Sequence, residues 1–181
     1  MTDISWKDHK KDIIVAIFIV IVIVLLVSLV FLIWRIKAEK SYRESFENGL
    51  NLGIGINAFD MKNEVGLISN NDYEEFKRAY DDFYFNPSRS NFDRLEKIMM
   101  KNIIIEDLQY GKDVDGMMDG LFVGDTKTSM ETLHRNKIIS NEMYAEYKIV
   151  IDEIIENPNH EKVNKYVDYM KDLYKKIKDG V

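Results

Sequence analysis

One uninterrupted apolar stretch constrains this chain more than any other feature of its sequence. Residues 13–34, IIVAIFIVIVIVLLVSLVFLIW, carry no charged side chain. As a helix rising about 1.5 Å per residue, the stretch is roughly 33 Å long, and a bilayer's hydrocarbon core is about 30 Å thick. It is too long for the apolar part of a signal peptide, and no small-x-small cleavage site follows it. Because a core helix of this length is rarely apolar on every face, the stretch predicts one transmembrane helix.

Both flanks of this predicted span carry residues that membrane interfaces favour. Trp6 precedes the span and Trp34 closes it, as in an aromatic belt, while Arg35 and Lys37 follow at the headgroup boundary. The span contains no glycine and no ionisable residue, so it offers neither a close-packing face nor an ion path. We therefore expect a passive anchor in the lipid bilayer, with docking against a larger membrane protein as the alternative.

The basic residues around the span predict its orientation by a narrow margin. Three lysines precede the span and four basic residues follow it, namely Lys7, Lys10 and Lys11 before, and Arg35, Lys37, Lys40 and Arg43 after. The positive-inside rule then places the C-terminal domain in the cytoplasm, and an extracytoplasmic domain is the alternative.

Composition and residue spacing argue against several classes of function. A net charge of −6 gives nucleic acid no counterion-release gain, and without cysteine there is no disulfide or thiolate metal site. His9, His134 and His160 lack metal-ligand spacing. The acid-rich segment 113–125 misses the glycine or the glutamate that a calcium loop needs. We expect no cofactor, no metal and no catalytic residues.

The rest of the chain contains an internal repeat. Residues 45–101 align on 116–172 without a gap, at an offset of 71 residues (116 minus 45). Both Asn-Pro pairs of the chain, at 86–87 and 157–158, fall on one repeat position. The other identical pairs are Gly49/Gly120, Leu50/Leu121, Gly53/Gly124, Ile68/Ile139, Ser69/Ser140, Asn70/Asn141, Tyr73/Tyr144, Glu75/Glu146, Lys77/Lys148, Asp81/Asp152 and Met99/Met170. Such self-similarity predicts two copies of one structural unit.

Each copy reads as three helices. In the first copy Gly66 ends one helix and Ser69 caps the next; in the second, Lys137 replaces the glycine, so we expect Asn136 in the left-handed position. Each Asn-Pro pair predicts a third helix, with asparagine as N-cap and proline at the first helical position. Aromatic and aliphatic residues at helical spacing, Tyr73, Phe76, Tyr80, Phe83 and Tyr84 in the first copy, predict a core stripe.

Small residues recur every four positions in the first helix of each copy. They are Ser45, Gly49 and Gly53 in one copy and Gly116, Gly120 and Gly124 in the other. A glycine inside a helix costs about 1 kcal/mol relative to alanine, so this stripe needs a compensating contact. Packing of the two first helices on each other is one interpretation, and binding of another protein's helix is the second. A third is that these stretches are loops.

The segments GLISNNDYEEFKRAYDDF (66–83) and KIISNEMYAEYKIVIDEI (137–154) resemble the helical hairpins of SHOCT-type modules. The resemblance lies in the phrase G-[IL]-I-[ST]-x-x-E-[FY] and covers about 18 residues per copy. The second copy departs from it at Lys137 and at Met143, where an acid is expected. The resemblance implies a small oligomerising or adaptor hairpin and does not extend to the whole chain.

Taken together, these features predict an all-α protein with four segments. They are an N-terminal tail (1–12), a transmembrane helix (13–34) and two three-helix repeats (35–110 and 111–181). The first functional hypothesis is a single-pass, non-catalytic interaction or scaffold protein that binds an unidentified protein partner. A homo-oligomer and a larger membrane complex are both compatible with this hypothesis. The alternative is an accessory subunit of a multi-span complex for transport, secretion or energy conversion. An enzyme with a buried metal or carboxylate site is the third.

Overall fold

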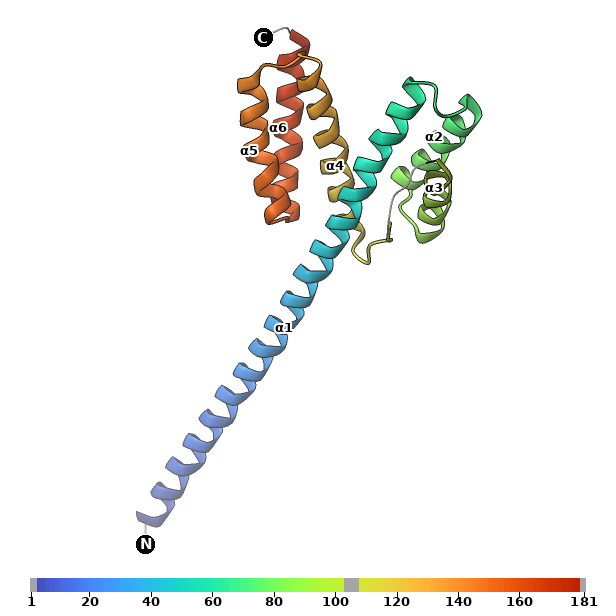
Figure 1. Ribbon diagram of the computed structural model, residues 1–181. Coiled ribbons are helices and arrows are strands. Elements are labelled where there is room, and N and C mark those ends of the chain that lie inside the picture. The colour runs from blue at the N-terminus through green and yellow to red at the C-terminus, as the bar shows by residue number, and fades with distance from the viewer. Residues whose placement is uncertain (1–2, 103–107, 180–181) are drawn as a thin grey trace. The chain divides into compact units, whose positions relative to one another are not determined.

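The protein is all-α, as predicted. The computed structural model describes residues 3–102 and 108–179, with side chains from residue 13 onward, and this part of the chain contains six helices and no strand. The helices are α1 (Asp3–Glu64), α2 (Asn70–Phe85), α3 (Arg89–Asn102), α4 (Val114–Arg135), α5 (Asn141–Glu156) and α6 (His160–Asp179) (Figure 1). The chain divides into two units, Met1–Lys40 and Ser41–Val181.

The first unit is the leading part of α1 and carries the apolar stretch. This helix is long and apolar enough to cross a membrane. The large side chains from Ile13 to Trp34 are 37–66% exposed, so no described part of the chain covers them. Although the sequence suggested separate helices for the span and the first repeat, α1 continues to Glu64. Residues 35–48 contain neither glycine nor proline, which would have ended it.

The second unit has the same order of helices in its two halves. The end of α1 is followed by α2 and α3, and α4 is followed by α5 and α6. Each triplet surrounds a separate core, to which the first helix of the other half also contributes side chains. The first core includes Leu52, Phe59, Phe76, Phe83, Phe92, Leu95 and Met99, and the second includes Met130, Tyr147, Ile151, Ile154, Val163, Tyr166 and Met170. The predicted core stripe is wrong at one position, because Tyr84 is 44% exposed.

The joints after α1 and α4 are built alike. Ser69 and Ser140 cap the following helices, and their hydroxyl oxygens accept the N–H groups of Asp72 and Met143. The preceding helices end in a left-handed residue, but in the second half this residue is Lys137, with φ 57°, and not Asn136. The main chain explains this. The N–H groups of residues 137 and 138 bond to the carbonyls of 134 and 133, as those of 66 and 67 bond to 63 and 62. This paired hydrogen bonding requires the left-handed residue at one fixed place.

The predicted roles of the Asn-Pro pairs are wrong. Asn86 and Asn157 are the C-caps of α2 and α5. The following helices are capped two residues later, where Ser88 Oγ accepts the N–H of Asn91 (3.3 Å) and Asn159 Oδ1 accepts the N–H of Lys162 (3.0 Å). Proline disfavours helical geometry in the residue before it, so each asparagine ends one helix without starting the next.

Lys137 provides a test of the joint. A left-handed residue with a Cβ costs roughly 1–2 kcal/mol, partly recovered as lower chain entropy in the unfolded state. We expect Lys137→Gly to stabilise the protein by about 0.5–1 kcal/mol. Gly66→Ala should destabilise it by a similar amount, although no atom lies within 4 Å of the added Cβ. Thermal unfolding of the detergent-solubilised chain measures both changes, and opposite signs would contradict this account.

Candidate functional site

The glycine stripe lies between α1 and α4. A Cβ on Gly49 would overlap the carbonyl oxygen of Met117, and a Cβ on Gly120 would overlap that of Phe46. These two contacts exchange when each residue is moved by the repeat offset, since 46 and 49 become 117 and 120. The helices therefore meet main chain to main chain, in a reciprocal arrangement.

The next turn repeats this arrangement. A Cβ on Gly53 would overlap the carbonyl oxygen of Leu121, and a Cβ on Gly124 would overlap that of Leu50. Because contacts advance along both helices together, this part of α1 and α4 run parallel. Stripes of small residues spaced by four are the usual means by which two helix backbones approach so closely.

The first residues of the stripe, Ser45 and Gly116, also lie in the contact between α1 and α4. A Cβ on Gly116 would lie 2.7 Å from the carbonyl oxygen of Tyr42. Ser45, which occupies the matching position in α1, is buried, and its Oγ accepts the N–H of Asp113 at 2.9 Å. Asp113 is the N-cap of α4, and its carboxylate accepts the N–H of Gly116. Ser45 thus fixes the start of α4 on α1.

All six residues of the stripe are buried in the second unit. They are Ser45, Gly49, Gly53, Gly116, Gly120 and Gly124. The stretches that carry them are helical, not loops. In this structure the stripe is occupied by the chain itself, so it presents no free surface to another protein's helix.

A polar cluster joins three helices beside the stripe. The Tyr42 hydroxyl donates to Asp119 Oδ2 (2.6 Å), and His160 Nδ1 lies 2.7 Å from the same oxygen. The hydrogen bond to Asp119 and its charge raise the pKa of His160, with smaller contributions from Asp115 and Asp113. Burial and the same carboxylate raise the pKa of Tyr42. Sequence reasoning missed this cluster, because its members lie far apart in the chain.

A cleft of about 390 Å³ opens where the last turns of α1 and α4 meet α6. Its lining residues are Asn57, Asp60, Met61, Glu64, Ser129, Thr132, Leu133 and Tyr174. Met61 and Tyr174 are 42% and 40% exposed, which leaves apolar surface open to solvent. The cleft is therefore accessible to solvent and partly apolar.

Carboxylates give this cleft a negative side. Burial raises the pKa of Asp60, and Glu64 adds to the shift, while the Tyr73 hydroxyl donates to Asp60 at 3.0 Å. Asn57 donates to Asp125 Oδ1 at 2.5 Å and to its main-chain oxygen at 3.1 Å. Burial raises the pKa of Asp125 as well. Among the described residues, no group of three or more acids or histidines is placed to hold a metal ion.

The predicted membrane-interface residues lie in the first unit. Trp34 is 66% exposed and packs against Phe31, with ring centroids 6.2 Å apart. Arg35 bonds to Glu39 one helical turn later, at 2.9 Å. Lys37 is exposed. The side chain of Trp6 lies outside the described part of the structure.

Comparisons with protein-family models, with curated proteins and with solved structures find no match to this chain.

The overlap at the stripe predicts an unusual response to alanine. Alanine in place of glycine gains about 1 kcal/mol of helix propensity, yet at Gly49 and Gly120 the new methyl group meets a carbonyl oxygen. We expect Gly49→Ala and Gly120→Ala each to destabilise the protein by at least about 1–3 kcal/mol, and Gly53→Leu and Gly124→Leu by more. Asn51→Ala, on the exposed side of α1, is the matched control and should be neutral or stabilising. Unchanged unfolding midpoints for the glycine variants would contradict the packing of α1 on α4.

The His160–Asp119 contact predicts a pH dependence. Because the folded pKa of His160 is raised above the unfolded value of about 6.5, protonation favours the folded state. This stabilisation is complete below the unfolded pKa and is lost as pH rises through the folded pKa. We expect the unfolding midpoint to fall as pH rises above about 6.5 and through the raised pKa of His160, and to fall less in His160→Gln. Equal pH dependence in both proteins would show that the contact is not responsible.

Proposed function

We propose that this chain is a single-pass, membrane-anchored helical interaction protein without catalytic activity. The observation that carries the proposal is the helix from Ile13 to Trp34, whose large apolar side chains are all exposed in the folded chain. Exposure of so much contiguous apolar surface to water is unfavourable, and a bilayer is the environment that would cover it. The folded unit after residue 40 would then be held at a membrane surface. The distribution of basic residues around the span favours the cytoplasmic side.

The cleft around Met61 and Tyr174 is a surface of the folded unit that fits a binding role. The stripe is buried where α1 packs on α4, whereas the cleft around Met61 and Tyr174 is open to solvent. Its apolar residues would provide the contact area, and Asp60 and Glu64 would favour a partner with basic groups. The resemblance of segments 66–83 and 137–154 to SHOCT-type hairpins also favours an adaptor role. We therefore assign partner binding to this cleft.

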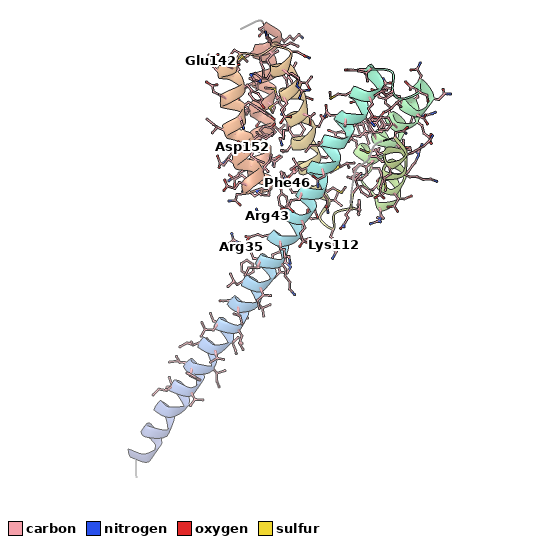
Figure 2. All side chains as sticks on the ribbon, in the orientation of Figure 1. Arg35, Arg43, Phe46, Lys112, Glu142 and Asp152 are labelled. Atoms are coloured by element: carbon pink, nitrogen blue, oxygen red, sulfur yellow. The ribbon has the colours of Figure 1, made fainter. Side chains whose placement is uncertain are left out.

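Site-specific photo-crosslinking in native membranes tests this role. A photoreactive amino acid at Met61 or Ser129, inside the cleft, should give one discrete crosslinked product. The same group at Asp152, exposed on α5 (Figure 2), is the matched control and should give none. If the control gives the same product, or the cleft positions give none, binding at the cleft is refuted. Native mass analysis of the product then separates a soluble partner or second copy from a multi-span complex of which this chain is a subunit.

Orientation is tested separately by cysteine labelling, which is clean because the chain has no cysteine of its own. Lys178 is exposed near the end of α6. We expect Lys178→Cys to resist an impermeant maleimide in intact cells and to react after the cells are opened. Ready labelling of intact cells would place the folded unit on the outer side.

A further inference from the structure

The end of α2 exposes an aromatic pair. Phe85 is 81% exposed, more than any large apolar residue of the candidate span, and Tyr84 beside it is 44% exposed. Their rings pack edge to face, with centroids 5.4 Å apart. The matching position in the second half, 156 (85 plus 71), is a glutamate, so the fold does not require an aromatic residue there. Phe85 is therefore available for a contact outside the folded unit.

Contacts within the second unit place this pair at one defined end. Tyr110 donates to the carbonyl oxygen of Pro87 at 3.2 Å, and the neighbouring Gly111 lies against Ser45. On the other side of α1, Arg43 donates to the carbonyl oxygen of Glu156 at 2.9 Å. Both Asn-Pro turns therefore flank residues 43–45, close to where the folded unit begins at Ser41. We call this the Asn-Pro end, and Figure 2 labels Arg43 and Lys112 there.

The chain itself limits how far this end can be from a membrane. Six residues, 35–40, separate Trp34 at the close of the candidate span from Ser41. Even fully extended, at about 3.3–3.6 Å per residue, they reach only about 25 Å. The beginning of the folded unit is thus tethered within reach of the headgroup layer, whatever its orientation.

We propose that Phe85 and Tyr84 form a second membrane contact, in which their rings enter the interfacial layer of the leaflet on the side of the folded unit. The proposal rests on the membrane anchoring proposed above. Tyrosine favours this layer because it has both an apolar ring and a hydroxyl group, and the adjoining Phe85 ring adds apolar area to the contact. Phe85 and Tyr84 belong to the folded unit, and neither residue lines the cleft that we assign to partner binding.

The charges near this end indicate the kind of contact. Arg89 is paired with Asp93 at 2.7 Å, and Arg43 with Glu47 at 3.6 Å. Because the two rings are uncharged and Arg89, close to them in the chain, is already paired, we expect the contact made by the rings to be apolar and to need no anionic lipid. It should form equally on zwitterionic and anionic bilayers and withstand salt.

Lipid quenching of a fluorophore on the full-length chain tests the proposal. Bimane is attached to Ser90→Cys, an exposed site beside the turn, in nanodiscs of phosphatidylcholine doped with a lipid that carries a nitroxide near its headgroup. Asn71→Cys, exposed at the other end of α2, is the distal reporter. We expect at least about twofold stronger quenching at position 90 than at 71, unchanged by salt. Phe85→Glu, which copies the second half, should abolish this excess.

Three comparisons make the outcome decisive. Ile149→Glu, at a site 71% exposed on α5, is the matched control and should leave the excess quenching intact. Equal quenching at positions 90 and 71, or no effect of Phe85→Glu, overturns the second contact; so does a change in bimane emission without lipid quenching, which would indicate a protein neighbour. Leu25→Cys reports on the anchor. If its bimane is not quenched by lipids labelled deep in the chain, the anchoring itself fails. If it is quenched while position 90 is not, only the second contact fails.

Discussion

The folded unit depends on the contact between the main chains of α1 and α4. Close approach lets the two helices exchange side chains across the stripe. Met117 and Leu121 of α4 pack into the core of the first half, whereas Phe46 of α1 packs into the core of the second. Phe46 and Met117 are 71 residues apart, the offset at which the sequence aligns with itself. Each core is thus completed by side chains from the other half. Both cores therefore require the glycines, although each glycine costs about 1 kcal/mol of helix propensity.

The two halves share this packing, but at one place they differ by a set of three residues. In the second core Thr126 Oγ1 lies 2.7 Å from the hydroxyl of Tyr166, which in turn donates to Tyr147 at 3.3 Å. Burial raises the pKa of Tyr166 to about 12 and also raises the pKa of Tyr147, so both phenol groups stay neutral hydrogen-bonding partners. The matching positions of the first core are Gly55, Leu95 and Phe76. A buried hydroxyl without a partner is costly, so the three polar residues are expected to occur together or not at all.

The sequence was informative where a local pattern determines the structure. Helical spacing predicted most of the buried positions, with Tyr84 as the exception, and Ser69 and Ser140 were identifiable as N-caps from their neighbours alone. Prediction failed where main-chain hydrogen bonds outside the motif determine the conformation of a residue. Lys137 is left-handed because two hydrogen bonds require it, although its type argues for Asn136. The contact of Tyr42 with Asp119 had no sequence signal, since it joins residues from two helices whose packing the sequence leaves open.

One helix, α1, carries the candidate span and also packs into the folded unit, and this constrains how the folded unit can change. Residues of α1 beyond Ser41 supply Phe46 and Leu52 to the two cores, so the folded unit cannot release this helix without losing both. Polar contacts from α4 and α5 also hold the start of this segment: Ser45 accepts the N–H of Asp113, Asp119 accepts the Tyr42 hydroxyl, and the Glu156 carbonyl at the end of α5 accepts from Arg43. Deprotonation of His160 weakens the hold of α6 on Asp119 but leaves Tyr42 bonded to it. The pH-dependent part of this cluster is therefore the contact of α6 with Asp119, whereas the hydrogen bond between α1 and α4 does not depend on the charge of His160.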